Sequence, residues 1–224
     1  MPTDDRHPLA GRFVAFDGGE GCGKSTQIHK LRDALTPELA VEMIRDPGST
    51  FVGERVRHLL LDPESEMGMR CEMLLYTAAR AQLVEETIGP ALEAGHLVLS
   101  DRFVSSTLAY QLGGDGLTAD EIEAVGRIAT AGRMPDLTII LDVPTDVAQA
   151  RVVPKFVAMF EDADAPGDKD RIERRPAEYH RRVRENFLAQ ACRHPECYAV
   201  VDAARSIDEV ASDVRSLVRE RLGG

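Results

Sequence analysis

Eight consecutive residues, Gly18 to Ser25, constrain the fold of this chain more than any other segment. They read Gly-Gly-Glu-Gly-Cys-Gly-Lys-Ser and match the pattern G-x-x-x-x-G-K-[ST] at every fixed position. An apolar run at residues 13–16 precedes them, and a segment able to continue as a helix starts at Thr26. A strand, a glycine-rich turn and a helix in this order surround phosphate oxygens with backbone N–H groups. The pattern therefore predicts a nucleoside-triphosphate site.

The individual loop residues suggest distinct roles. Lys24 is placed to reach the outer phosphates, and the Ser25 hydroxyl to ligate Mg²⁺. The start of the helix adds positive potential at the same point. A glycine turn without a ligand is the alternative, but it gives no reason for Lys and Ser at these positions. A dinucleotide fingerprint is excluded because Lys24 stands where its last glycine is required. The predicted nucleotide-binding residues are Gly18, Gly19, Glu20, Gly21, Cys22, Gly23, Lys24, Ser25 and Thr26.

Composition excludes several other classes of protein. The 224 residues carry a net charge of −11, which argues against a surface that coats nucleic acid. No apolar run approaches the roughly 20 residues that span a bilayer, and the first residues lack the apolar centre of a signal peptide. We therefore expect a cytoplasmic protein without membrane or nucleic-acid partners, and a flexible tail at residues 1–10.

The four cysteines form no C-x-x-C pair. A zinc site at Cys192, His194 and Cys197 is an alternative, but nothing elsewhere in the chain resembles a matching half-site. Free thiols in a reducing compartment explain the cysteines better.

The strand pattern predicts the sheet. Five short apolar stretches lie at residues 13–17, 40–45, 97–101, 138–142 and 198–202, with helical patterns between them. Alternation of this kind indicates a parallel sheet with helices on both faces. Carboxyl ends of parallel strands share one edge, where ligands bind. We therefore expect the residues at those ends to surround the glycine loop: Asp17, Arg45, Asp101, Asp142 and Asp202.

Helix signals complete the fold prediction. Capping boxes at Thr118 with Glu121 and at Ser206 with Glu209 mark two helix starts. Apolar spacing predicts one long helix over residues 67–87 and another over residues 176–190. Residues 161–170 are acidic, contain Pro and Gly and are predicted to form a mobile loop.

A second set of residues suggests that a phosphate is transferred. Asp101 and Arg102 follow a predicted strand, where the carboxylate would organise Mg²⁺ and the guanidinium would hold another phosphate. Arg45 lies in a turn on the same edge. An exposed Asp–Arg pair and a plain turn are the alternatives, and position alone does not single out Asp101 among the strand-end aspartates. A GTPase is excluded because the single asparagine, Asn186, is not in an N-K-x-D motif.

These residues belong to five ordered motifs that resemble the thymidylate kinase family of the nucleoside-monophosphate kinases. The loop run 17–26 is similar to the family's loop, and Tyr76 to Arg80 is similar to its aromatic-x-A-x-R stretch. The motifs quoted in full are Arg45-Asp46-Pro47-Gly48-Ser49-Thr50, similar to R-E-P-G-G-T with Asp and Ser substituted; Asp101-Arg102-Phe103 through Ser106 to Ala109-Tyr110-Gln111; and Asp170-Arg171-Ile172-Glu173. The similarity runs from residue 13 to the last predicted helix.

The resemblance implies an α/β fold of three layers, the P-loop NTPase fold, with a five-stranded parallel sheet, helices on both faces and a mobile lid. It implies one kinase domain at residues 11–224, with the lid at about 152–170. The implied reaction is the Mg²⁺-dependent transfer of the γ-phosphate of ATP to dTMP in dTTP biosynthesis, by a homodimer.

The resemblance also implies roles for individual residues. Tyr76 would stack on thymine and Arg80 would bond its edge, although a core aromatic and a solvated arginine are alternatives. The base pocket would include Ser106, Thr107 and Tyr110, although a helical threonine is ordinarily a packing residue. The 5′-phosphate would be held by Arg45 and Arg102; Asp17 and Glu20 would complete the dTMP site, with Glu20 near the 3′-hydroxyl; and Arg151 would lie against adenine. The implied catalytic set is Lys24, Asp101, Arg102 and Arg171, and the implied metal ligands are Ser25 and Asp101.

The lid departs from the family pattern. No arginine occurs at residues 152–170, so we favour Arg171 over Lys169, Arg174 and Arg175 as the lid arginine. Residues 156–160 include apolar side chains that either dock a closed lid or, as we prefer, pack an extended helix.

Rival functions remain open. A phosphate monoester has a second pKa of about 6 and needs no strong base. The rivals are a kinase of another nucleoside monophosphate, a deoxynucleoside kinase that uses Glu20 or Asp17 as base, and a regulatory ATPase.

Overall fold

The computed structural model describes residues 7–148, 150–151 and 170–223. The tail expected at residues 1–10 lies outside this range up to residue 6, whereas Leu9 is buried in the core. The lid expected at residues 152–170, with the apolar segment 156–160, lies outside the described residues except for Asp170. The mobile loop expected at residues 161–170 falls outside in the same way.

The centre of the molecule is a five-stranded parallel sheet in the order β2-β3-β1-β4-β5. The predicted parallel sheet with helices around it is confirmed. The strands are β1 (Phe13–Asp17), β2 (Val41–Arg45), β3 (Leu97–Asp101), β4 (Leu137–Asp142) and β5 (Tyr198–Asp202). Their boundaries lie within one residue of the predicted ones. The register pairs Phe16 and Arg45 with Asp101, so these strands end at one edge of the sheet.

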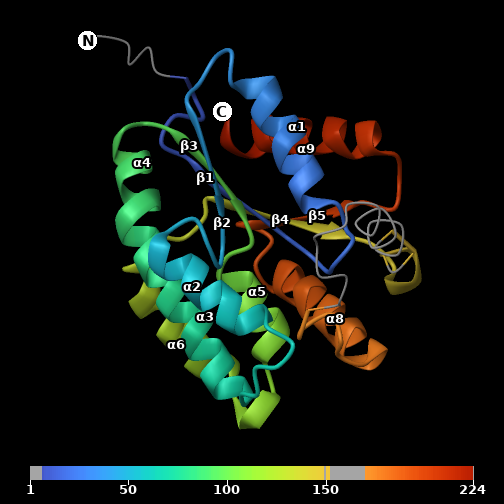
Figure 1. Cartoon of the computed structure of the whole chain (residues 1–224). Helices are drawn as coiled ribbons and strands as arrows, with labels where there is room; N and C mark the ends of the chain where they lie inside the picture. The colour runs from blue at the N-terminus through green and yellow to red at the C-terminus, as the bar shows by residue number, and fades with distance from the viewer. Residues whose placement is uncertain (1–6, 149, 152–169, 224) are drawn as a thin grey trace, which may run out of the picture.

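Helices cover both faces of this sheet (Figure 1). Helices α1 and α9 lie on one face, where Ile28 and Val214 pack against the sheet residues Val14 and Leu99. The opposite sheet residues, such as Phe13, face the remaining helices and contact Phe103 just before α5. The alternation follows from the two-residue period of a strand. The helix bounds are α1 Lys24–Leu35, α2 Phe51–Leu61, α3 Met69–Leu83, α4 Gly89–Glu93, α5 Val104–Gln111, α6 Ala119–Thr130, α8 Ala177–Arg193 and α9 Ile207–Leu222.

The helix starts predicted from capping boxes are confirmed. Thr118 caps α6 and Ser206 caps α9, each with its glutamate three residues later. The helix predicted over residues 176–190 is α8. The long helix predicted over residues 67–87 differs in detail, because α3 ends at Leu83 and passes through a π-helical turn into α4. Pro90 explains the change, since it has no N–H to donate and interrupts the regular hydrogen-bond ladder.

Two further sequence expectations are tested by the described residues. Within this part of the chain, none of the helices combines the length and apolar character needed to cross a bilayer. All four cysteines are free thiols, as expected, and Cys192, His194 and Cys197 do not form a three-ligand group among the described side chains.

Candidate active site

The glycine loop connects β1 to α1 with backbone geometry that only glycine readily adopts. Gly18 has a φ of 135°, and a Cβ at this position would lie 2.5 Å from the carbonyl oxygen of Leu141. Lys24, the first residue of α1, donates from its ammonium to the carbonyls of Gly18 at 3.3 Å and Gly19 at 3.0 Å. A buried cation therefore spans the loop beside the positive end of a helix, where phosphate oxygens bind.

Ser25 and Asp101 meet although they lie on different elements. The Ser25 hydroxyl donates to Oδ2 of Asp101 at 2.9 Å and links the first turn of α1 to the end of β3. A hydroxyl and a carboxylate are oxygen ligands that suit Mg²⁺, which keeps several waters and binds phosphates as well. The donor set at this point therefore fits the predicted metal.

Arg102 brings a second cation to the same loop. Its Nη1 donates to the Gly18 carbonyl and to the Ser106 hydroxyl, both at 3.1 Å. Because Lys24 donates to the same carbonyl, the two nitrogens lie within about 6.4 Å, the sum of their distances to that oxygen. Arg102 adopts a φ of 73°, which is unusual for a residue other than glycine. Backbone conformations of this kind cluster at active sites. The two predicted cations thus meet at Gly18.

The buried carboxylate of Asp17 lies next to the Arg102 guanidinium. Its carboxylate is inaccessible to solvent and accepts hydrogen bonds from the hydroxyls of Ser105 and Ser106 and from the Phe103 amide. Burial raises the pKa of Asp17, while the charge of Arg102 and the hydroxyl bonds oppose that rise. An oxygen of Asp17 lies 3.7 Å from Nη1 of Arg102. Asp17 is therefore placed to orient the guanidinium.

A cavity of about 210 Å³ opens beside Arg102, and we call it the arginine cavity. It contains most of the predicted substrate residues: Glu20, Tyr76, Arg80, Arg102, Ser106, Thr107 and Tyr110. Burial raises the pKa of Tyr76 and of Tyr110, so both hydroxyls remain protonated near neutral pH. Arg102 lies over the Tyr110 ring with its Cζ 5.1 Å from the ring centre. The cavity combines three arginines with two aromatic side chains.

Arg45 does not line this cavity. Its side chain is about half exposed and pairs with Glu54 at 3.1 Å. Arg57 of α2, which the sequence analysis missed, lines the cavity instead and donates to the Pro47 carbonyl at 3.2 Å. Burial and the charge of Arg45 lower the pKa of Arg57. No sequence signal distinguishes Arg57 from other helix arginines, since its place depends on how α2 packs.

Lys24 lines a groove of about 410 Å³, which we call the loop groove. It runs along residues 21–27 and is closed by Arg151 and the segment that precedes α9. Arg151 donates to the carbonyls of Ala203 at 2.8 Å and Ala204 at 3.0 Å, so the structure brings this predicted residue to the loop. Arg205 also lines the groove and was missed, because it belongs to no motif.

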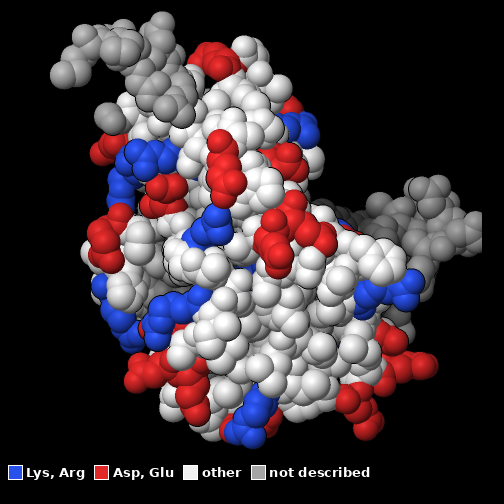
Figure 2. All heavy atoms as spheres, turned by 90° about the vertical axis from the view of Figure 1, so that its left-hand side faces the viewer, with Lys and Arg blue, Asp and Glu red and all other residues white. Residues whose placement is uncertain are grey.

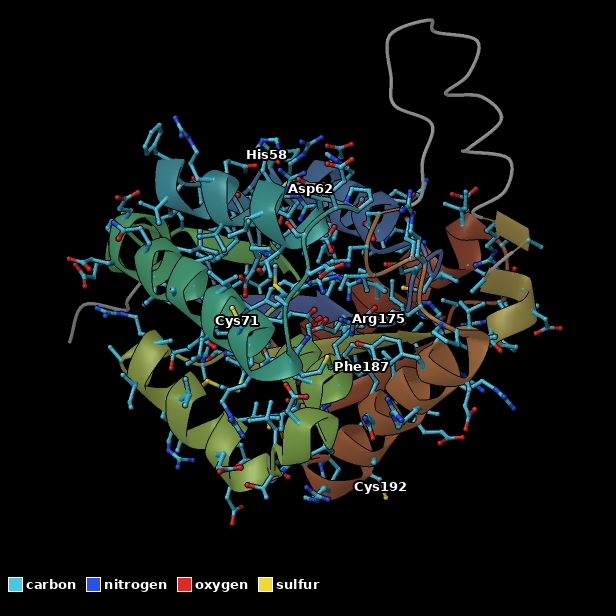
Figure 3. The ribbon with its side chains drawn as sticks, turned by 60° about the horizontal axis from the view of Figure 1, so that its bottom comes forward. His58, Asp62, Cys71, Arg175, Phe187 and Cys192 are labelled. Carbon is cyan, nitrogen blue, oxygen red and sulfur yellow. The ribbon has the colours of Figure 1, made fainter. Side chains whose placement is uncertain are left out.

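Arg171 is not brought to the glycine loop. Its guanidinium donates to the Leu60 carbonyl at 2.9 Å and to the buried carboxylate of Glu72 at 2.5 Å. Arg175 donates to the same Glu72 oxygen, and Figure 3 shows Arg175 in the interior of the molecule, far from Cys192 at the outer end of α8. A role of Arg171 at the phosphates requires it to leave Glu72.

Three carboxylates that line the arginine cavity lie close to one another. Ligand atoms of Glu20, Asp170 and Glu173 lie within 4.8 Å of one another. The sequence analysis placed only Glu20 at this site. Asp170 and Glu173 belong to the D-R-[IF]-E motif, so their position could have been inferred from it.

The fold and the site together define a class of protein. The sheet is parallel and has a glycine loop with Lys and Ser at its edge. Beside the loop lies a cationic cavity whose Arg102 donates to the same carbonyl as Lys24. Together these features define a P-loop phosphotransferase of the nucleoside-monophosphate kinase type.

Comparison with known proteins narrows this class. The family model described as thymidylate kinase matches residues 16–214. A thymidylate kinase of Neisseria gonorrhoeae is 40% identical over 213 residues, which cover 95% of this chain and 98% of the relative. Those of Symbiobacterium thermophilum and Thermoanaerobacter pseudethanolicus are 42% and 37% identical, covering 94% and 96% of this chain and 94% and 100% of the relatives. The chain belongs to the thymidylate kinase family.

Proposed function

We propose that this protein transfers the γ-phosphate of ATP to dTMP, giving dTDP for nucleotide biosynthesis, with Mg²⁺ at Ser25 and Asp101. The convergence of Lys24 and Arg102 on the Gly18 carbonyl carries this proposal. ATP would occupy the loop groove and dTMP the arginine cavity, so that the phosphates of both nucleotides meet at the rim between them. Positioning and charge neutralisation are the main requirements for phosphoryl transfer.

On the donor side, the chain supplies backbone N–H groups from the loop and the ammonium of Lys24. These groups stabilise negative charge that spreads over the transferred phosphoryl oxygens. Arg151 closes the outer end of the groove, where its planar guanidinium provides a surface for the adenine ring. Bound Mg²⁺ would neutralise phosphate charge and orient the oxygens.

On the acceptor side, the arginine cavity has unsatisfied polar atoms. In the described part of the chain, five buried side-chain nitrogen or oxygen atoms have no hydrogen-bond partner, and four of them belong to residues lining this cavity. They are Oδ1 of Asp46, Nη1 of Arg80, Oγ1 of Thr107 and the hydroxyl of Tyr110. Buried polar groups are rarely left unpaired, so their concentration here supports a polar ligand. A pyrimidine with carbonyl and N–H groups matches this set.

The chemistry of the acceptor explains why a strong base is not required. A phosphate monoester is largely dianionic near neutral pH and attacks directly. Asp17 is fully engaged by Ser105, Ser106 and Phe103, which disfavours its use as a base toward a hydroxyl. Asp17 is therefore a poor candidate for the base that a deoxynucleoside kinase needs.

We propose that two copies of the chain form a homodimer, because apolar side chains are exposed on two of its helices. Phe51 and Leu59 of α2 and Leu74 of α3 are 75%, 48% and 50% exposed. Figure 2 views the side of the molecule on which α2, α3 and α6 lie, and it shows uncharged surface between the charged groups.

A cytoplasmic location accords with the free thiols.

A panel of acceptors tests the proposed function. Purified protein is incubated with ATP and Mg²⁺ and with dTMP, dUMP, dCMP, dGMP, AMP or thymidine, and ADP formation is measured. We expect dTMP to give the highest kcat/KM and chelation of Mg²⁺ to abolish turnover. Preference for thymidine or another monophosphate would select a rival kinase. ADP release independent of acceptor would indicate a regulatory ATPase.

A further inference from the structure

A buried ion pair supports the arginine cavity from behind. Nε of Arg80 on α3 donates to Oδ2 of Asp46, in the turn after β2, at 2.5 Å. The two side chains are 2% and 0% exposed. Taking both charges out of water is costly, and an apolar pair of similar size is often as stable. Stability alone therefore does not explain why this ion pair is buried here.

Three contacts restrain the Arg80 guanidinium. Asp46 binds Nε, the Phe103 carbonyl accepts from Nη2 at 3.2 Å, and the Phe103 ring lies beside the group with its centre 5.3 Å from Cζ. A guanidinium is planar, so two bonded nitrogens and one covered face determine where the third nitrogen points. Nη1 of Arg80 is that nitrogen, and it has no partner in the described structure.

We propose that Asp46 is a positioning residue for base recognition. It holds Arg80 so that Nη1 donates a hydrogen bond to a carbonyl of the acceptor base. This inference rests on the proposed function and adds the residue that orients Arg80 toward the base. A base that presents an amine at this point brings a donor against a donor and leaves both unpaired. A site built to bond one polar group discriminates strongly against an analogue without it.

Asp46 could instead act only through its general negative charge, because Arg57 and Arg102 also line the cavity. The two roles make different predictions. A general charge effect changes the affinity of every nucleoside monophosphate, since it acts on the shared phosphate. A positioning role changes only the affinity of bases that present the carbonyl.

The test compares D46N with the unchanged protein. Asparagine keeps the shape and an acceptor oxygen but removes the charge that fixes Arg80. Dissociation constants are measured by calorimetry for dTMP, dUMP and dCMP, with steady-state kinetics for dTMP and ATP. We expect dTMP and dUMP to bind about 10- to 100-fold more weakly, the range for loss of an oriented charged hydrogen bond. Binding of dCMP should change less than about threefold, and the dTMP defect should appear in KM rather than kcat.

A matched control and a second pair of variants keep the test decisive. D136N removes an exposed ion pair with Arg12 at 3.0 Å, outside the cavity, and should leave all three affinities unchanged. If D46N does not fold, R80M is compared with D46N/R80M, since the double variant removes both buried charges. Equal dTMP affinity of these two supports action through Arg80, and weaker binding by the double variant contradicts it.

Other outcomes also decide the question. Equal weakening of dTMP and dCMP in D46N, or no weakening of either, overturns the inference while the kinase activity stands. Failure of the unchanged protein to phosphorylate dTMP would instead overturn the proposed function.

Discussion

The arginine cavity and the loop groove are built in different ways. Side chains from α2, α3 and α5 form the cavity, and its central residues Arg80 and Tyr110 are buried. Backbone of the glycine loop forms much of the groove, and Ser25 and Thr26 within it are exposed.

This difference shows where selectivity resides. A loop of backbone N–H groups recognises phosphate, which all nucleotides share. A cavity lined by oriented side chains recognises a particular base. We therefore expect substitutions at the shared rim to reduce turnover and substitutions deeper in the cavity to affect one substrate only.

The largest effect is expected at the rim. Lys24→Met should lower kcat by about 1,000-fold, in the range found when a preorganised charge-stabilising group is removed. Steady-state kinetics would measure it, and thermal unfolding would show that the protein is folded. Lys30→Met, on the same helix with an exposed partner in Asp208, is the control and should retain full turnover. Near-normal turnover of the Lys24 variant would mean that the rim does not stabilise the transferred phosphoryl group.

A smaller loss is expected for Arg102→Lys. Lysine keeps the charge but lacks the planar guanidinium, which lies over the Tyr110 ring while its Nη1 contacts Gly18 and Ser106. We expect kcat to fall about 100-fold, because removal of one positioned donor has effects of this size. A change below about threefold would show that charge alone suffices at this position.

Tyr76→Leu should separate the two sites. Stacking of a base on an aromatic ring contributes about 1–3 kcal/mol, so KM for dTMP should rise about 10-fold or more. KM for ATP should stay constant because Tyr76 lines only the arginine cavity among the pockets described here. Parallel rises in both constants would argue that the two sites are not independent.

The smallest effect concerns pH and Asp17. Burial raises the pKa of this carboxyl above its ordinary value of 3.8, so the folded state binds its proton more tightly than the unfolded state does. The contribution of Asp17 to stability therefore falls as pH rises from 3.8 through the raised pKa. Denaturant unfolding of the wild type and Asp17→Asn should show a wild-type advantage that shrinks as the pH is raised from about 4. An advantage that grows over that range would assign Asp17 a lowered pKa.

Sequence reasoning reached the sheet and much of the cavity because the signals are local. Apolar strands, capping boxes and a fixed-spacing loop each depend on neighbouring residues. It missed Arg57 and Asp46, and it placed Arg45 and Arg171 at phosphates where the structure pairs them with Glu54 and Glu72. These partners are distant in sequence or depend on helix packing, so no local pattern specifies them.

Binding of a linked dinucleotide tests the central claim most directly. Adenosine and thymidine joined through a chain of phosphates would occupy the loop groove and the arginine cavity at once if the two meet at Gly18. Tethering makes the second contact intramolecular, so we predict affinity at least about 100-fold above that of ATP or dTMP alone, with competition against both. An affinity no higher than that of one nucleotide, or competition with only one of them, would contradict the shared rim.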